Sequence, residues 1–274
     1  MTTQTLSAQS ISRDIYDNAA PARLEGLTVV LPCFNEAANV AEAIHHAARA
    51  ARRNARAHQI VVVDDGSSDG TGDIAREVAR KVPHVLVVGH DVNRGYGAAL
   101  ISGLRAAVMP WVLLTDADLQ FDLEQLERFV PLTDEADYVL GWRIDRQDPL
   151  HRRVNAHAWN WLVGHAFGLG VRDVDCAFKL IRRDVVDGVR LTSSGAMIST
   201  ELLVRAKANG ARVRELGVEH LPRVAGEQSG ANPRVVLRAF RELRELRAQM
   251  RAGDTAPDPA TAPATTTPIT SAAA

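Results

Sequence analysis

Short runs of β-branched and aliphatic residues alternate with longer segments of helical period from residue 27 onward. The first four apolar runs predict strands at residues 27–33, 59–64, 84–89 and 111–115. The segments between them are rich in alanine and begin at turns with Asn, Ser, Asp or Gly, which predicts helices at residues 36–52, 69–80 and 96–108. This alternation is typical of an α/β domain with a mostly parallel central sheet.

The second half of the chain is less regular. It predicts a strand ending at Trp142, a helix at 152–167, a strand at 173–181, a helix at 200–209 and a strand ending at Val218. Asn232-Pro233 then opens a last helix, 234–251, with one apolar face and one face that is mostly arginine. We therefore expect one half at residues 23–122, a second half at 123–232 and an amphipathic helix at 233–251.

The two ends of the chain lack this pattern. Residues 252–274 are almost wholly Ala, Thr, Pro and Asp, which cannot bury enough apolar surface to offset the entropy lost on ordering. We expect this tail and residues 1–22 to be disordered. A chain of 274 residues can bury one substantial core, so residues 23–251 are predicted to form one domain.

Charge, cysteine use and hydropathy narrow the class of protein. A formal net charge of -1 argues against a protein that coats nucleic acid, so anion binding must be local. Cys33 and Cys176 are far apart and lack metal-ligand spacing, which favours buried free thiols in a reducing cytosol. No secretory signal and no run of about 20 apolar residues is visible. We expect a cytoplasmic protein that meets membranes, if at all, peripherally at the inner face of the plasma membrane.

Each of the four leading strands ends in a polar cluster. The clusters are P-C-F-N-E at 32–36, D-D-G-S-S-D-G-T at 64–71, N-R-G-Y-G at 93–97 and D-A-D-L-Q at 116–120. In open α/β sheets, ligands bind beyond the carboxyl ends of the strands. The joint spacing of the clusters therefore predicts one ligand site at that edge.

Asp116 and Asp118 form a D-x-D pair directly after an apolar strand. Mg²⁺ or Mn²⁺ prefers carboxylate oxygens and completes its shell with water and diphosphate oxygens. An isolated pair of this kind is usually a solvated turn, but three other strand-end clusters accompany this one. The pair is therefore predicted to bind a divalent cation that stabilises a departing diphosphate.

Asp64 and Asp65 can accept hydrogen bonds from a base N–H or from ribose hydroxyls, while Gly66 lets the backbone approach closely. Gly95 and Gly97 precede a helix, as in a phosphate cradle. They do not form a G-x-G-x-x-G motif, and by themselves they also fit an ordinary turn.

Together the clusters resemble those of GT-A glycosyltransferases of family 2, most closely the dolichol-phosphate mannose synthase and polyprenyl-phosphate glycosyltransferase branch. The resemblance covers roughly residues 27–245 and rests on P-x-F-N-E, D-D-G-S-x-D-G-T and D-A-D-L-Q. It implies the GT-A fold, a Rossmann-like nucleotide-diphospho-sugar transferase fold. It also implies that residues 23–122 bind the sugar donor and residues 123–232 the acceptor.

The resemblance assigns residues to the donor site and to the metal. It implies donor binding by residues of the first, second and fourth clusters, and we add Gly95 from the third: Pro32, Phe34, Glu36, Asp64, Asp65, Gly95, Asp116 and Ala117. It implies that Asp116, Asp118 and Gln120 hold Mg²⁺ or Mn²⁺ with the diphosphate of a nucleotide sugar, of the GDP-mannose or UDP-glucose type. D-A-D-L-Q is the form associated with polyprenyl-phosphate acceptors.

Arginines of the second half support such an acceptor. An alcohol needs a general base, whereas a phosphomonoester is already an anion near neutral pH and needs arginines to position it. The candidates are Arg143, Arg152, Arg153 and Arg223, and the resemblance implies that Arg143, Arg152 or Arg153, and Arg223 face the acceptor phosphate, as in the related synthases. We predict that Asp118, Arg143 and Arg223 carry an inverting, in-line displacement. Asp175, in D-C-A-F-K, is the nearest candidate for a base, although it could equally orient Arg or Lys side chains.

Two alternatives stay open at this point. One is a soluble family 2 transferase that acts on a hydroxyl, with Asp175 or Glu201 as its base. The other is a catalytically silent nucleotide-sugar-binding partner of a membrane protein.

The lipid of such an acceptor lies in a membrane. Trp159, Trp161, Leu162 and Phe167 on one predicted helix, and the arginine-rich last helix, would suit a membrane surface. The last helix would equally suit packing on the domain or on a second subunit of a homodimer.

Overall fold

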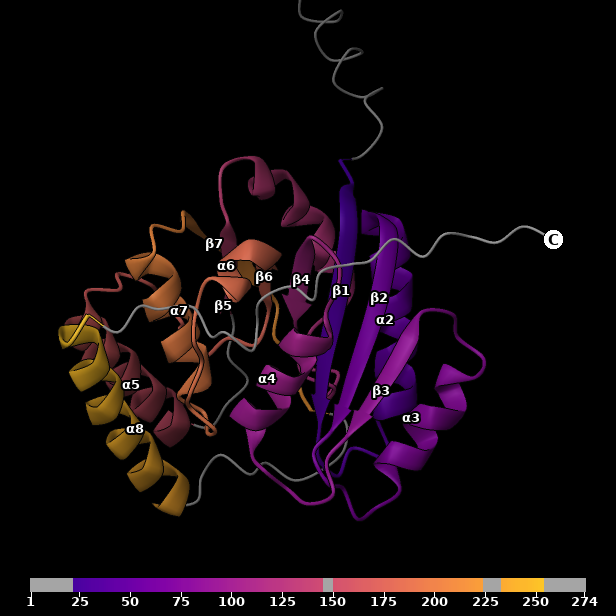
Figure 1. The fold of residues 1–274 in the computed structure, drawn as a ribbon, viewed down its shortest axis with the longest axis horizontal. Helices are drawn as coiled ribbons and strands as arrows, with labels where there is room; N and C mark the ends of the chain where they lie inside the picture. The colour runs from indigo at the N-terminus through magenta and orange to yellow at the C-terminus, as the bar shows by residue number, and fades with distance from the viewer. Residues whose placement is uncertain (1–21, 145–149, 224–232, 254–274) are drawn as a thin grey trace, which may run out of the picture.

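The computed structural model describes residues 22–144, 150–223 and 233–253; side chains of 150–155 and 233–236 are not described. Its centre is a seven-stranded sheet in the order β3-β2-β1-β4-β6-β5-β7 (Figure 1). The strands are β1 Leu24–Cys33, β2 Ala55–Asp64, β3 Val85–Gly89, β4 Trp111–Leu114, β5 Tyr138–Arg143, β6 Lys179–Arg182 and β7 Val213–Val218. Only β6 runs antiparallel to its neighbours β4 and β5, so the expected mostly parallel sheet is confirmed for the described residues.

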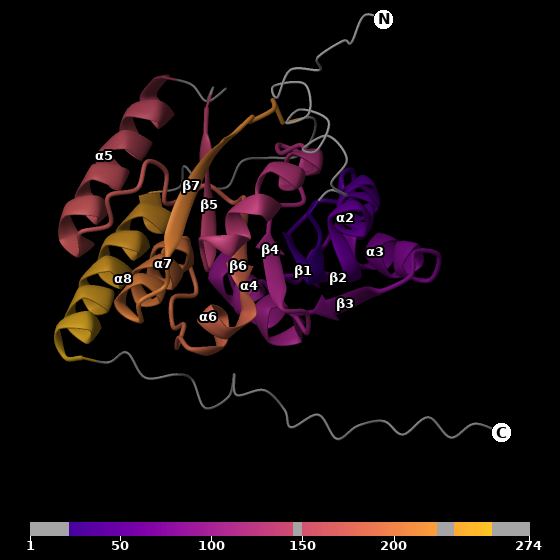
Figure 2. The same ribbon diagram turned by 90° about the horizontal axis from the view of Figure 1, so that it is seen from above.

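Helices cover both faces of the sheet (Figure 2). The α-helices are α2 Val40–Asn54, α3 Thr71–Ala79, α4 Tyr96–Ala106, α5 Leu150–Phe167, α6 Arg183–Asp187, α7 Ile198–Ala208 and α8 Pro233–Arg251. Two short 3-10 helices, η1 Leu123–Arg128 and η2 Val130–Asp134, follow the turn after β4. None of the described helices is long and apolar enough to cross a membrane.

The strand residues divide alternately between two hydrophobic cores, as the period of two requires. Val29 and Leu31 of β1 face a core shared with α2, α3 and the two 3-10 helices. Val30 faces a second core shared with α4, α7 and α8. Cys33 and Cys176 are buried free thiols, as expected.

The parallel register brings the predicted clusters to one edge of the sheet. Cys33 pairs with Asp64, and Asp64 pairs with Gly89. On the other side of β1, Val30 pairs with Leu114. The loops that follow these strands therefore meet at the same edge.

Several predicted boundaries were wrong. The strand predicted at 173–181 begins only at Lys179, because residues 173–178 form a turn held by side chains. The helix predicted from residue 36 begins at Val40, because Glu36 to Asn39 form a preceding turn in which the Asn39 N–H bonds the Glu36 carbonyl. Residues 252 and 253 continue α8 as a turn. The rest of both predicted disordered ends, apart from Ala22, lies outside the described residues.

Candidate active site

The turn after β4 carries the two carboxylates that the sequence assigned to a metal. Ala117 is buried between Asp116 and Asp118. Leu119 adopts a φ of 61°, a left-handed conformation that a leucine rarely takes. The Asp118 carboxylate accepts a hydrogen bond from the Gln120 N–H at 3.2 Å, which closes this tight turn. Such strain is stored preferentially at functional sites.

The two carboxylates are close enough to influence each other. Burial and the negative charge of Asp116 raise the pKa of Asp118 to about 6. Burial also raises the pKa of Asp116, whereas a hydrogen bond from Tyr96 and the charges of Lys179 and Arg143 act in the opposite direction. Asp118 is buried and Asp116 is half-buried, and two such carboxylates that repel each other form a site that a cation would stabilise.

Tyr96, which the sequence reasoning missed, holds the first carboxylate. Its hydroxyl donates a 3.0 Å hydrogen bond to Asp116 Oδ1. Burial and the charge of Asp116 raise the pKa of Tyr96 well above its usual value, so it remains a donor. A tyrosine between two glycines at a helix start was the available signal.

Asp65 connects the second and third clusters. Its carboxylate accepts hydrogen bonds from the N–H groups of Arg94 and Gly95 at 2.9 and 2.8 Å. The His90 ring bonds the same carboxylate at 2.6 Å and Ser102 of α4 at 2.9 Å. Asp65 therefore fixes the start of α4, and Gly95, with a φ of 100°, supplies the turn.

The remaining donor candidates lie around the end of β1. Pro32 is buried in the strand opposite Val63, whereas the Phe34 ring is 44% exposed. Asp64 accepts a hydrogen bond from the Ser67 N–H at 3.1 Å. Glu36 follows on the same loop and is half-buried. The end of β1 and the loop after it therefore offer a ligand both an apolar ring, from Phe34, and carboxylates.

Arg223 crosses from the second half of the chain to these carboxylates. Its guanidinium forms an ion pair with Glu36 and lies 3.8 Å from Asp118 Oδ2. Gln120 holds the same segment, because its side chain donates to the Leu221 carbonyl at 3.1 Å and its carbonyl accepts from the Leu221 N–H at 2.8 Å. Gln120 thus bonds the Leu221 backbone, and its predicted role toward a metal stays a prediction.

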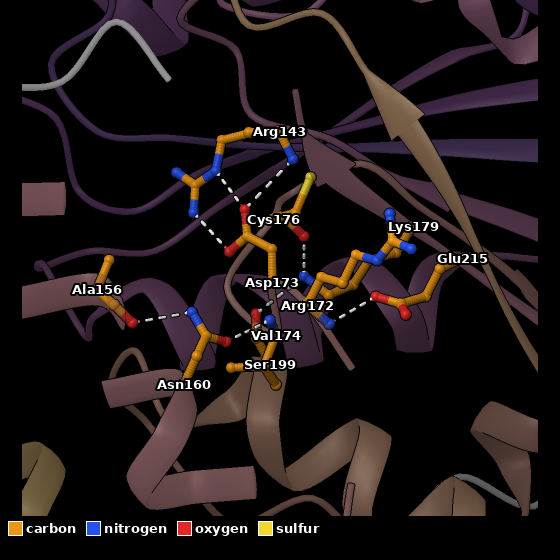
Figure 3. A network of polar contacts seen from close by, with 10 residues as sticks. All are labelled: Arg143, Ala156, Asn160, Arg172, Asp173, Val174, Cys176, Lys179, Ser199 and Glu215. Atoms are coloured by element: carbon orange, nitrogen blue, oxygen red, sulfur yellow. Dashed lines mark hydrogen bonds and ion pairs between the residues drawn. The ribbon is translucent and has the colours of Figure 1, made fainter. Parts of the chain in front are cut away.

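Arg143, at the end of β5, is held by Asp173 in a two-pronged ion pair (Figure 3). The two hydrogen bonds measure 2.7 and 2.8 Å. Burial alone would lower the pKa of Arg143, but the bonds to Asp173 raise it above its ordinary value, so the guanidinium stays charged. The Asn160 side chain of α5 in turn holds the Asp173 turn through the Val174 N–H at 2.9 Å.

Lys179 is a buried lysine whose role the sequence did not predict. Its ammonium group bonds the Cys176 carbonyl and lies 3.4 Å from Ser199 Oγ (Figure 3). Burial lowers its pKa, while Cys176, Asp175, Asp173 and Asp116 raise it. The negative charge of Asp175 thus acts on the Lys179 ammonium group, and whether Asp175 is a base or an orienting residue stays a prediction.

Glu201 does not fit the role of a base. Its carboxylate is fully buried, pairs with Arg205 at 2.9 Å and accepts hydrogen bonds from the backbone of Thr192 and Ser193. A general base must reach the proton that it removes. Arg152 and Arg153 lie in α5, and their side chains are outside the described part of the structure.

The apolar face of α8 is partly buried and partly exposed. Leu243 and Leu246 are buried in the second core, whereas Leu237 and Phe240 are exposed. Phe240 also contacts Trp159 of α5, with ring centroids 5.6 Å apart. Packing on the domain therefore accounts for part of this face.

The donor set fits a divalent cation only if a ligand contributes. The described residues hold no group of three or more His, Cys, Asp or Glu side chains arranged for a metal. Two carboxylates can still bind Mg²⁺ or Mn²⁺ when diphosphate oxygens and water complete the shell. The mutual repulsion of Asp116 and Asp118 is the observation that favours this.

The fold is of the GT-A class of glycosyltransferases. The chain belongs to Glycosyl transferase family 2, whose sequence model matches residues 28–190. Its fold is similar to that of mannosyl-3-phosphoglycerate synthase from Rubrobacter xylanophilus, with a TM-score of 0.61, 19% identity and coverage of 84% of this chain and 75% of that one. A glucosyl-3-phosphoglycerate synthase from Mycobacterium tuberculosis, in complex with Mn²⁺, UDP-glucose and phosphoglyceric acid, gives a TM-score of 0.62 at 16% identity, covering 94% and 87%.

The relatives similar in sequence are named for undecaprenyl phosphate, whereas the structural neighbours are named for phosphoglycerate. The chain is 31% identical over 207 residues to the undecaprenyl-phosphate 4-deoxy-4-formamido-L-arabinose transferase of Edwardsiella ictaluri, covering 74% of this chain and 62% of that protein. The protein of the same name from Aeromonas hydrophila is 30% identical, with 73% and 61% covered. This chain therefore spans about three fifths of the length of these curated relatives.

Proposed function

We propose that this protein transfers a sugar from a nucleotide diphosphate to a polyprenyl phosphate, with inversion at the anomeric carbon and with Mg²⁺ or Mn²⁺ bound. The names of the curated relatives support the acceptor class. The neighbouring structure with Mn²⁺ and UDP-glucose supports the donor class and the cation.

One observation carries the proposal: the charge of a guanidinium group acts on each of the two repelling carboxylates. The charge of Arg143 acts on Asp116, and Arg223 lies 3.8 Å from Asp118. A phosphate bound between these arginines would therefore lie next to the diphosphate end of the donor. Arginine suits this task because its planar fork binds phosphate oxygens in pairs.

The chemistry needs no protein base. A phosphate monoester has a second pKa near 6, so its attacking oxygen is ionised at neutral pH. Arg143 stays charged because Asp173 raises its pKa. Glu201, one of the two alternative bases, is enclosed by its own partners. The cation, when bound by Asp116 and Asp118, would neutralise charge on the leaving diphosphate.

The nucleoside would lie against Phe34, Glu36, Asp64 and Asp65 at the ends of β1 and β2. Arg223 pairs with Glu36 and would have to exchange this contact when the donor binds. Both uridine and guanosine offer the N–H and ribose donors that these carboxylates accept. The donor therefore has to be identified by experiment.

The lipid acceptor requires access to a membrane surface. Trp161 of α5 and Leu237 and Phe240 of α8 are exposed, and α8 also exposes Arg241 and Arg244. Apolar and cationic side chains on one helix suit an anionic bilayer surface, where each basic residue contributes about 1 kcal/mol. We propose peripheral binding through α5 and α8.

The test is sugar transfer by the full chain with a radiolabelled donor, Mn²⁺ and a short polyprenyl phosphate. Donors are UDP-glucose, GDP-mannose and a UDP-pentose, the last because the relatives are named for an arabinose derivative. The proposal predicts label in an organic-extractable, acid-labile product. Transfer to hydroxyl acceptors alone, or nucleotide binding without turnover for any acceptor, would contradict it.

A matched pair of variants makes the assay specific. Asp118→Asn keeps the size of the side chain but removes its charge, and we expect it to abolish transfer. Asp134→Asn makes the same change at an exposed position in η2 and should leave transfer unchanged. Equal activity of both variants would remove Asp118 from the reaction.

A further inference from the structure

A loop from Thr192 to Gly195 lies against the start of α4 without space for a side chain. The Gly97 N–H donates to the Ser194 carbonyl at 3.1 Å. A methyl group at Gly97 would lie 2.4 Å from the Ser193 carbonyl oxygen, and one at Gly95 would lie 2.6 Å from that of Ser194. Tyr96, between these glycines, donates to Asp116. The position of the loop therefore determines where Tyr96 can lie.

Glu201 of α7 binds this loop through hydrogen bonds. Its carboxylate accepts from the Thr192 and Ser193 N–H groups at 3.0 and 2.7 Å and from the Thr192 hydroxyl at 3.0 Å. Arg205, one turn later, neutralises the carboxylate at 2.9 Å. Both side chains are almost completely buried. A buried charge pair with all these bonds satisfied fixes its surroundings tightly.

The last helix, α8, also binds this loop. Arg238 of α8 donates to the Ser194 hydroxyl, and it also pairs with Glu242 at 2.9 Å. Gln249 of α8 accepts a hydrogen bond from Arg205 at 2.6 Å. Two turns of α8 are thus bonded to the network that ends at Tyr96.

We propose that Glu201, Arg205 and Arg238 are positioning residues, which hold the 192–195 loop against residues 95–97 and so keep Tyr96 and Asp116 in the arrangement that binds the cation. This inference rests on the proposed metal site. It means that α8, far from the reacting atoms in sequence, sets the affinity of the site. None of the three is among the residues assigned to the donor, the acceptor or the cation.

The test measures Mn²⁺ binding by electron paramagnetic resonance, with saturating UDP or GDP, alongside the melting temperature. The variant is Arg238→Ala, and the matched control is Arg241→Ala on the same helix, which loses only an exposed pair with Glu245 at 3.8 Å. Arg238→Ala should weaken Mn²⁺ binding about 3- to 10-fold, the range for one lost hydrogen bond. Its melting temperature should fall below that of the control, because the buried Glu242 carboxylate also loses its partner, so the double-mutant cycle decides between positioning and destabilisation.

A double-mutant cycle separates positioning from general damage. If Arg238 acts through Tyr96, then Arg238→Ala should weaken Mn²⁺ binding much less in a Tyr96→Phe background than in the wild type. Equal Mn²⁺ affinities of Arg238→Ala and Arg241→Ala, or fully additive effects in the cycle, would overturn the inference. Wild-type protein that binds no Mn²⁺ with either nucleotide would instead overturn the proposed function.

A second variant tests the contact itself. Gly97→Ala adds a methyl group where the Ser193 carbonyl lies, whereas Gly164→Ala in α5 adds one where nothing lies within 4 Å. Gly97→Ala should weaken Mn²⁺ binding at least as much as Arg238→Ala, and Gly164→Ala should not. Unchanged Mn²⁺ affinity in Gly97→Ala would contradict the proposal.

Discussion

The Tyr96 hydroxyl donates a hydrogen bond to Asp116, and the two residues before Tyr96 donate their backbone N–H groups to Asp65. The carboxylate assigned to the nucleoside and the carboxylate assigned to the cation are therefore joined through one short segment. A movement of the Asp65 carboxylate would therefore also displace the Asp116 carboxylate, and the reverse.

The hydroxyl of Tyr96 can be removed alone. Tyr96→Phe should lower sugar transfer about 10- to 100-fold, because a hydrogen bond to a charged group contributes about 1.5–3 kcal/mol. Tyr138→Phe is the control, since its buried hydroxyl has no hydrogen-bond partner among the described residues. Initial rates at saturating donor would show the difference, and equal rates for the two variants would exclude a role for the Tyr96 bond.

The Asp118 carboxylate should destabilise the metal-free protein above pH 6. Its pKa is about 6 in the folded protein and near 3.8 in the unfolded chain, so the folded state loses stability as the pH rises from about 4 to 6. Asp118→Asn should therefore raise the melting temperature at pH 7.5 by about 2–6 °C and have little effect at pH 4. Scanning calorimetry with a chelator tests this, and a lower melting temperature at pH 7.5 would contradict it.

Asp137 should have the opposite pH dependence. Hydrogen bonds from Arg212 lower its pKa to about 2, although burial opposes this, so its contribution is complete above pH 4 and is lost as the pH falls toward 2. Asp137→Asn should cost about 1–2 kcal/mol at pH 7 and almost nothing at pH 2. Urea unfolding at both pH values is the measurement. Asp184→Asn, at an exposed partner of Arg182, should cost much less, and a loss that persists at pH 2 would argue against ionic stabilisation.

Arg143 should act on the acceptor rather than the donor. Lysine cannot reproduce the two-pronged contact with Asp173, so Arg143→Lys should raise the KM for polyprenyl phosphate about 10-fold and leave the KM for the nucleotide sugar nearly unchanged. Arg214→Lys, in an exposed pair on β7, is the control. A change confined to the donor KM would contradict the assignment.

The sequence predicted those features that depend on local pattern. Strands β1 to β4 and the clusters that follow them were predictable, because buried parallel strands are apolar runs and their carboxyl ends meet at one edge. Residues 173–178 were predicted as part of a strand because they include apolar residues. In the structure these apolar residues are buried in a turn and do not belong to the sheet. The stability of this turn comes from Asn160 and Asp173, which act across the fold.

Contacts between distant segments could not be predicted. Glu201 was a candidate base until its enclosure by Thr192, Ser193 and Arg205 was visible. Likewise, the apolar periodicity of α8 could not show whether its apolar face packs on a membrane surface or on the domain. Burial of Leu243 and Leu246 beside exposed Leu237 and Phe240 depends on where the second core ends.

The central claim is that the turn after β4 holds a divalent cation together with a nucleoside diphosphate. Anomalous diffraction from crystals soaked with Mn²⁺ and UDP or GDP tests it most directly. The account predicts one strong peak within bonding distance of an Asp118 oxygen and a diphosphate oxygen, and none in Asp118→Asn crystals. A bound nucleotide without such a peak, or a peak away from residues 116–120, would contradict it.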